Sequence, residues 1–149
     1  MDAAPDAALR LDRQVCFPLY AASNLLIRRY RPLLDALGLT YPQYLVMLVL
    51  WEAAPLSVGE IGQRLYLDSG TLTPLLKRME RAGLITRQRT SADERRVSID
   101  LSEAGRALHE QARTIPSTLL CEIGLTGDEL AALRAQLQAL TRRLAEQGK

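Results

Sequence analysis

Two cysteines and a group of tyrosines are the side chains through which this chain could do chemistry. Cys16 lies in the stretch QVCFPLYAASNLLIRRY, where apolar and aromatic residues recur at helical spacing. A cysteine in such surroundings is either a small hydrophobic residue of the core or, as a thiolate, a nucleophile. The residues around Cys16 do not decide between these roles, so the answer depends on the elements that position it.

The composition is that of an ordinary globular protein. Of the 149 residues, 48% are hydrophobic and 24% are charged, and the length suits one domain with its own core. The longest apolar run, residues 44–51, is too short to span a bilayer, and the N-terminal MDAAPDAALR lacks the pattern of a secretion signal. We therefore expect a single domain over residues 1–149, a cytoplasmic location without membrane contact, and free thiols rather than a structural disulfide.

Basic residues concentrate in one part of the chain. The net charge is +2, but residues 77–96 hold seven basic and three acidic side chains, a local charge of +4. The basic members are Lys77, Arg78, Arg81, Arg87, Arg89, Arg95 and Arg96. Such a stripe is typical of a surface that binds a polyanion. Charge by itself still favours a solvated, salt-bridged surface, so other features must decide.

Apolar spacing predicts a series of helices. The first runs over about 11–37, with Pro18 near its first turns and Pro32 kinking or ending it. Capping boxes predict two further starts, at Thr40 in TYPQ and at Ser57 in SVGE, with helices to about 53 and 65. A fourth helix spans about 69–82 and ends at Gly83.

The spacing then changes to that of strands. LITRQR and RRVSIDL predict a β-hairpin around the polar turn TSADE. Ser102 starts a helix that runs towards Pro116, and the TGDE capping box starts a last one at Thr126. Leucines in the last helix recur at the spacing of a seam against another helix: Leu130, Leu133, Leu137, Leu140 and Leu144.

This order predicts a mainly α protein with a small β-hairpin, arranged as a winged helix-turn-helix. The helix over 69–82 would bury its leucines and leave hydroxyl and cationic side chains for a major groove: Ser69, Thr71, Thr73, Lys77 and Arg78. Arg95 and Arg96 at the hairpin would reach an adjacent groove. The alternative is a helical bundle whose hairpin has no role in DNA binding.

The segment LYLDSGTLTPLLKRMERAGLITRQRTSADERRVSIDLSEAG, residues 65–105, resembles the recognition helix and wing of the MarR family of dimeric bacterial transcription regulators. QVCFPLY, YRPLL and LGLTYPQYLVMLVLWE resemble its OhrR branch, repressors that sense organic hydroperoxides. The resemblance implies dimerisation helices over about 9–37 and 102–147, a DNA-binding unit over about 41–101, and a pseudo-palindromic operator as partner.

The resemblance also implies roles for individual residues. The cysteine of QVCF is the thiol that reacts with peroxide, and the tyrosines of IRRY and TYPQY are its hydrogen-bonding partners, which nominates Cys16, Tyr30 and Tyr41. Tyr20, one turn after Cys16, is a further candidate. The arginine of DER, Arg95, enters the minor groove.

A second cysteine distinguishes one group within this branch. There it resolves the oxidised first cysteine as a disulfide, and Cys121, placed near the end of the fifth predicted helix, has the matching position. The bond would join opposite subunits. The alternative is that Cys121 is an ordinary core residue.

Two other functions remain open. One is a MarR-type regulator that responds to a lipophilic or phenolic ligand without thiol chemistry. The other is a thiol peroxidase, which would need a reductant site and fast recycling that no feature of the sequence suggests. We expect no catalytic site, no cofactor and no metal, because His109 is the only histidine and no phosphate-binding glycine loop, acid pair or triad occurs.

Overall fold

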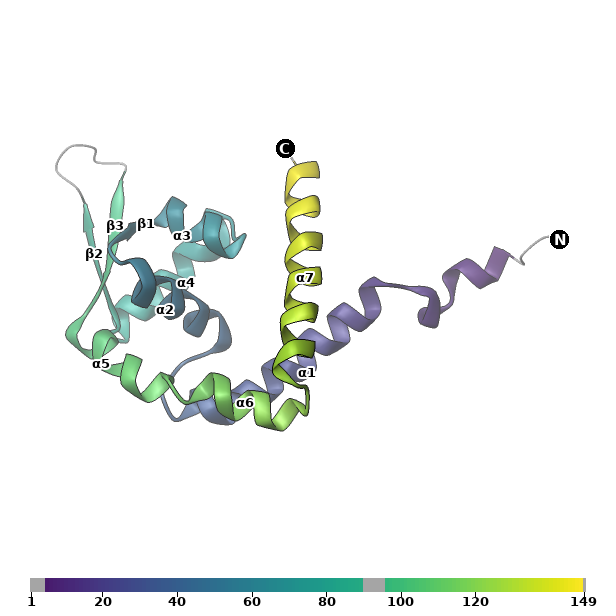
Figure 1. Cartoon of the computed structure of the whole chain (residues 1–149). Coiled ribbons are helices and arrows are strands. Elements are labelled where there is room, and N and C mark those ends of the chain that lie inside the picture. Colours follow the sequence, from purple (N-terminus) through teal and green to yellow (C-terminus); the bar gives the residue numbers. More distant parts are fainter. Residues whose placement is uncertain (1–4, 90–95, 149) are drawn as a thin grey trace. The chain divides into compact units, whose positions relative to one another are not determined.

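The computed structural model describes residues 5–89 and 96–148 (Figure 1). The chain forms two compact units, Met1–Arg113 and Thr114–Lys149. The first is a winged helix-turn-helix with a three-stranded antiparallel sheet, and the second consists of two helices. The predicted fold class is confirmed. The assignment of 9–37 and 102–147 to dimerisation, and of 41–101 to DNA binding, stays a prediction.

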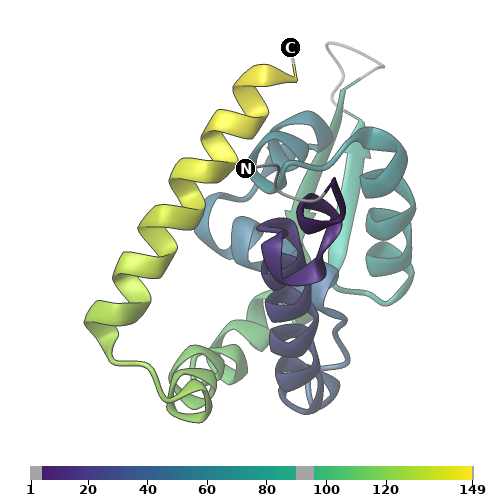
Figure 2. The same ribbon diagram turned by 90° about the vertical axis from the view of Figure 1, so that its right-hand side faces the viewer.

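The N-terminal segment leads into a long first helix. Two short 3-10 segments, η1 (Pro5–Leu9) and η2 (Leu11–Arg13), precede α1 (Cys16–Asp35) and lie at its N-terminal end in Figure 2. Pro18 is the third residue of α1, where a backbone N–H has no helical acceptor, so proline costs no hydrogen bond there.

The expectation that Pro32 ends this helix needs correction, while the alternative of a kink stays a prediction. Pro32 lies inside α1, which continues to Asp35. Proline removes only the hydrogen bond to the carbonyl four residues earlier, that of Arg28. Both Pro32 and Arg28 are exposed, so water can satisfy that carbonyl.

Two of the three predicted capping boxes precede the next two helices. Thr40 Oγ1 accepts from the Gln43 N–H at 3.4 Å while Gln43 Oε1 accepts from the Thr40 N–H at 3.1 Å, and α2 (Tyr41–Ala53) comes next. Ser57 and Glu60 make the same exchange at 3.2 and 2.7 Å before α3 (Val58–Leu65). These side chains satisfy N–H groups that the helix itself cannot.

The helix predicted for the major groove is α4 (Ser69–Arg81). Its cap is Asp68, whose Oδ1 accepts from the Thr71 N–H at 2.7 Å, a signal that sequence reasoning missed. Pro74 lies in its second turn, inside the helix. Gly83, at φ +75°, ends it as predicted. The apolar face of α4 is buried throughout: Leu72, Leu75, Leu76 and Met79.

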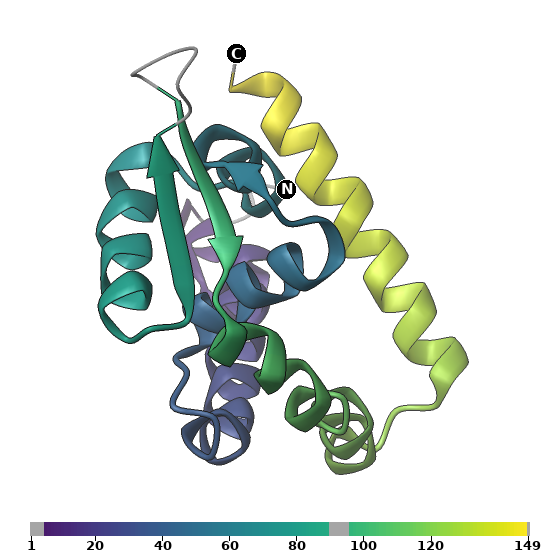
Figure 3. The same cartoon turned by 90° about the vertical axis from the view of Figure 1, so that its left-hand side faces the viewer.

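The sheet has one strand more than the hairpin that the sequence predicts. β2 (Ile85–Arg89) and β3 (Val97–Leu101) pair antiparallel with Arg87 opposite Ile99. β1 (Leu56–Ser57) adds to the free edge of β3, with Leu56 opposite Ile99, so the order is β1-β3-β2. Figure 3 shows β2 beside α4 and β1 on the other side of β3. A two-residue strand has no period that a sequence pattern can reveal.

The C-terminal helices divide differently from the prediction. α5 (Glu103–Ala112), capped by Ser102, stops before Pro116, and that proline is the second residue of a separate helix, α6 (Ile115–Ile123). Proline is favoured in the first turn of a helix, because backbone N–H groups there have no helical acceptor and the one that proline lacks is not needed. Cys121 therefore belongs to α6. The last helix, α7 (Gly127–Gln147), starts at the predicted Thr126 box.

The core of the first unit lies between α2, α3, α4 and the sheet. α2 contacts α1, α3, α4, α5 and β3, which makes it the central helix. Several large side chains there are fully or almost fully buried: Met47, Leu50, Ile61, Leu72, Leu76, Met79 and Ile99. This closed core holds α4 and the hairpin in place.

Candidate functional site

Cys16 is the first residue of α1 and is exposed. Its apolar neighbours Val15, Phe17 and Tyr20 are exposed as well, and Tyr20 retains 69% of its accessible surface. Cys16 is therefore not a buried core residue of its own chain, which was one of the two roles left open by the sequence. Its neighbourhood is apolar, as the sequence indicates.

The predicted pair Tyr30 and Tyr41 is brought together. Tyr30 from α1 and Tyr41 from α2 have ring centroids 4.9 Å apart, and Tyr44 joins them at 5.7 and 6.3 Å. Burial and the neighbouring Tyr41 and Tyr44 raise the pKa of Tyr30 to about 12, and burial raises the pKa of Tyr41 and Tyr44 also. All three phenols are neutral at physiological pH and can donate hydrogen bonds.

The tyrosine cluster is far from the thiol of its own chain. Tyr30 comes fourteen residues after Cys16 on the same helix. At a rise of 1.5 Å per residue this separates them by roughly 21 Å along the axis. One chain therefore does not combine the thiol with Tyr30 and Tyr41, whereas Tyr20 lies one turn from Cys16 on the same helix.

Cys121 lies in the second unit, near the end of α6, and its side chain is exposed. Leu119 and Ile115, on the same helix, are buried. Cys121 is thus outside the apolar face that packs, which argues against a core role for this thiol.

The polar face of α4 carries the side chains predicted to reach DNA. Ser69, Thr71, Lys77 and Arg78 are exposed and Thr73 is half-buried, while the leucines and Met79 occupy the opposite face. The hydroxyls lie in the first half of the helix and the cations in the second. This arrangement can present hydrogen-bonding groups to base edges and positive charge to the phosphates on either side.

The basic residues of the hairpin have unequal surroundings. Arg87 pairs with the buried Ile99, is itself half-buried, and its Nε is buried without a hydrogen-bond partner. Arg89 and Arg96 are exposed. The Ser57 N–H bond lowers the pKa of Glu60, and the charge of Arg96 adds to that effect, which puts Arg96 within electrostatic reach of the start of α3. Arg95 lies outside the described residues.

Other kinds of site find little support in residues 5–89 and 96–148. No group of three or more His, Cys, Asp and Glu that could hold a metal ion occurs in this part of the chain. None of its helices is long and apolar enough to cross a membrane.

Comparison with known proteins identifies the family to which this chain belongs. Residues 28–112 match the family described as transcriptional regulator SarA/Rot. The chain is 51% identical to the organic hydroperoxide resistance transcriptional regulator of Bacillus subtilis over 91% of this chain and 92% of that protein. The chain belongs to the MarR family, in the branch of the organic hydroperoxide resistance regulators.

Solved structures of another regulator, AbfR, are similar to this chain over most of its length. The structure of reduced AbfR bound to DNA, a protein of Staphylococcus epidermidis, matches with a TM-score of 0.78 and 36% identity over 94% of this chain and 98% of that one. The structure of disulfide-formed AbfR matches with a TM-score of 0.65 and 35% identity, over 91% of this chain and 96% of that one. The family predicted from the motifs is confirmed.

Sequence reasoning missed one member of the tyrosine cluster and one long-range hydrogen bond. Tyr44 completes the tyrosine cluster, and its spacing of three residues from Tyr41 on a helix is a signal that would have found it. Trp51, the last residue of the apolar run 44–51, is half-buried and donates from Nε1 to the Gly105 carbonyl at 2.9 Å. No local pattern predicts that contact.

Proposed function

We propose that this protein is a homodimeric repressor that binds operator DNA, senses organic hydroperoxides through oxidation of Cys16, and then releases the DNA. The observation that carries the proposal is an exposed thiol at the start of α1 in a chain 51% identical to an organic hydroperoxide resistance regulator. The protein acts in the cytoplasm, because that is the compartment that holds bacterial operator DNA.

The sensing step is a two-electron reduction of the peroxide. The Cys16 thiolate attacks the terminal oxygen of ROOH, the O–O bond breaks, and the products are the Cys16 sulfenic acid and an alkoxide that takes a proton from water to become the alcohol. A thiolate needs hydrogen-bond donors for stabilisation. Neutral tyrosine hydroxyls are suitable donors, and the exposed Val15, Phe17 and Tyr20 favour apolar peroxides.

The donors come from a second chain. The length of α1 separates Cys16 from Tyr30 and Tyr41 of its own chain by far more than a hydrogen bond. A dimer that pairs the exposed apolar start of α1 with the tyrosine cluster of the partner would bring them together and cover the thiol. Dimerisation then completes the sensor as well as the DNA-binding surface.

Cys121 resolves the sulfenic acid. Its thiol attacks the Cys16 sulfur, a disulfide forms between the two subunits, and water leaves. A disulfide holds its two Cα atoms within about 4.4–6.8 Å, so its formation displaces helices that a single added oxygen would leave in place. The DNA-reading units then lose the spacing that the two half-sites require.

DNA binding rests on α4 and the hairpin. Ser69, Thr71 and Thr73 read or position the major groove, and Lys77 and Arg78 contact phosphates. The remaining candidates of the basic stripe are Arg87, Arg89, Arg95 and Arg96. The roles of the α4 residues are supported by the exposed polar face of that helix. The roles of the four arginines are supported by the positive charge of the basic stripe.

The test is a gel shift on the DNA upstream of the protein's own gene, with and without cumene hydroperoxide. Wild-type protein binds when reduced and releases when oxidised, and dithiothreitol restores binding. Cys16→Ser binds in both conditions. Cys121→Ser, the matched control, forms no covalent dimer on a non-reducing gel and over-oxidises at Cys16.

The competing functions predict other results in the same experiment. Release of Cys16→Ser by peroxide, or by a phenolic ligand alone, would support a ligand sensor instead. Without a reductant we expect one cumene hydroperoxide reduced per Cys16. With a thiol reductant we expect turnover only at the slow rate at which the disulfide is reduced, and turnover as fast as the oxidation of Cys16 would support a thiol peroxidase.

A further inference from the structure

The tyrosine cluster is one end of a continuous row of aromatic rings. Tyr44 lies 5.7 Å from Tyr30 and 6.5 Å from Trp51, and Trp51 lies 5.5 Å edge-on to His109 of α5. These centroid distances are those of rings in direct contact. We call Tyr30, Tyr41, Tyr44 and Trp51 the aromatic row; it extends from α1 through α2 to the face of α5.

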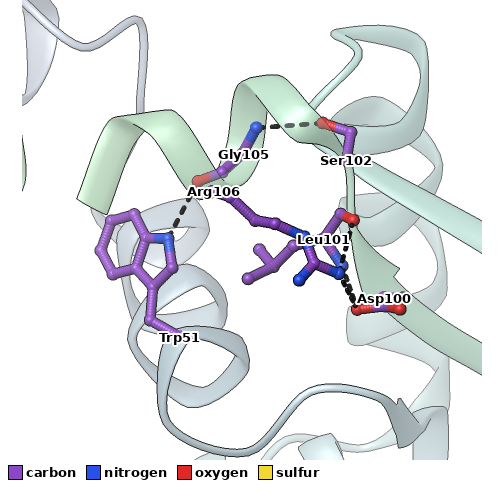
Figure 4. A network of polar contacts seen from close by, with 6 residues as sticks. All are labelled: Trp51, Asp100, Leu101, Ser102, Gly105 and Arg106. Carbon is purple, nitrogen blue, oxygen red and sulfur yellow. Dashed lines mark hydrogen bonds and ion pairs between the residues drawn. The ribbon is translucent and has the colours of Figure 1, made fainter. Parts of the chain in front are cut away.

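At its far end the row is tied to the backbone of α5. Trp51 Nε1–H donates to the Gly105 carbonyl at 2.9 Å, and the Gly105 N–H donates to Ser102 Oγ at 3.0 Å (Figure 4). Gly105 has no space for a side chain, because a Cβ there would collide with the Leu84 carbonyl. The first turn of α5 is therefore held tightly between Trp51 and the segment after α4.

That turn is also bonded to both elements that read DNA. The Ser102 hydroxyl donates to the Gly83 carbonyl at 2.6 Å and the Ser102 N–H to the Leu84 carbonyl at 3.1 Å, which ties it to the end of α4. Arg106 pairs with Asp100 of β3 at 3.1 Å. Hydrogen bonds and ring contacts thus run without a gap from Tyr30 to the recognition helix and the wing.

We propose that Trp51 is the positioning residue that transmits the state of the peroxide-sensing tyrosines to the DNA-reading elements, through its contact with Tyr44 and its hydrogen bond to Gly105. The proposal rests on the proposed function, because the signal starts when Cys16 oxidation removes the hydrogen bonds that hold Tyr30 and Tyr41. A shift of this ring pair moves Tyr44 and Trp51, since packed rings do not deform independently. The indole then shifts the first turn of α5 through its hydrogen bond to Gly105. Because that turn is bonded to the end of α4 and to β3, both elements move with it.

The decisive variant is Trp51→Phe, which keeps a ring in the row and removes the N–H donor. The measured quantity is the ratio of operator Kd in the oxidised and the reduced protein. We expect the reduced Kd to stay within twofold of wild type and the ratio to fall by about fivefold, the size of effect that a single hydrogen bond carries. A fall of threefold or more supports the proposal, and a smaller one overturns it.

Tyr44 supplies a matched pair of variants. Tyr44→Phe keeps the ring contact with Trp51, so its ratio stays closer to that of wild type than the ratio of Tyr44→Leu. Tyr44→Leu breaks the row while leaving the Trp51–Gly105 bond in place, and its ratio falls as in Trp51→Phe. Equal ratios in Tyr44→Leu and wild type would overturn the role of the row.

A second readout needs no substitution of Trp51 and so survives a folding defect in that variant. Trp51 is the only tryptophan of the chain. Cumene hydroperoxide changes the emission of the wild-type protein but leaves that of Cys16→Ser unchanged. If peroxide lowers the operator affinity of the wild-type protein but leaves its tryptophan emission unchanged, the role of Trp51 is overturned and the proposed function stands. If peroxide does not change the operator affinity of the wild-type protein, the proposed function itself is overturned.

Discussion

The core of the winged helix-turn-helix and the leucine row of α7 use the same type of side chain in opposite surroundings. Leu72 and Leu76 of α4 are 0% and 1% exposed, whereas Leu137 and Leu144 of α7 keep 38% and 61% of their surface. Both helices have the apolar spacing of a packed face. The difference teaches that the DNA-reading unit closes its core within one chain, while α7 and the start of α1 carry exposed apolar surface that the proposed dimer would cover.

The largest effect should come from the closed core. Leu76→Ala removes a buried side chain from α4 and lowers the free energy of unfolding by about 2–5 kcal/mol, because the cavity cannot collapse in a tightly packed site. Urea unfolding followed by circular dichroism measures it. Leu48→Ala, on an exposed position of the neighbouring α2, is the control and costs less than about 1 kcal/mol. Equal losses in both would contradict the assignment of the core.

The leucine row should instead affect association. The double variant Leu137→Ala/Leu140→Ala removes two side chains from the proposed interface, each contributing roughly 1.5–3 kcal/mol when fully buried, so the dimer Kd rises tenfold or more. Sedimentation velocity over a dilution series measures this shift, and the helical content at high concentration stays unchanged. A variant that remains dimeric at all dilutions would remove α7 from the interface.

A smaller effect separates the polar face of α4 from other basic surface. Lys77→Ala reduces the slope of log Kd against log salt by about one for each phosphate that the variant no longer touches, because fewer counterions are released on binding. Arg113→Ala is the control: this exposed cation pairs with Glu110 at 3.2 Å and lies outside the stripe. Identical slopes in wild type and Lys77→Ala would exclude Lys77 from the DNA interface.

The smallest effect concerns the tyrosine cluster of α1 and α2. The neutral phenol of Tyr30 is favoured in the folded state, with a pKa of about 12 against an ordinary 10. Its contribution to stability is complete below pH 10 and is lost as the pH rises towards 12. Tyr30→Phe should therefore leave the tyrosinate absorbance at 295 nm unchanged up to about pH 11. A loss of absorbance near pH 10 would contradict the burial of this ring.

Most helix boundaries could be predicted because their signals are local. The boxes at Thr40, Ser57 and Thr126 join residues three positions apart, and each is present in the structure. Pro32 and Pro116 show the limit of the same reasoning. Whether a proline ends or starts a helix depends on the next residues in the chain and on the packing around it. Accordingly, α1 continues through Pro32 to Asp35, whereas Pro116 is the second residue of α6.

The candidate site could be predicted in its members but not in its arrangement. The motifs nominate Cys16, Tyr30 and Tyr41, and the structure joins only the two tyrosines within one chain. The length of α1 separates the thiol from them, and a sequence motif has no information about which chain supplies a partner. Tyr44 was missed although its spacing of three residues from Tyr41 is a local signal, whereas the bond of Trp51 to Gly105 joins segments far apart in the sequence and no local pattern predicts it.

The sequence by itself determined the helix starts, the apolar faces, the basic stripe and the family, because periodicity, capping and motifs depend on neighbours within a few positions. Only the tertiary structure decided that β1 joins the edge of β3, that Arg87 turns its Nε inward, and that Trp51 bonds to Gly105. These are pairings of backbone and side-chain groups between distant segments. Their partners are chosen by how the helices and the sheet pack, and packing depends on all of their buried faces at once.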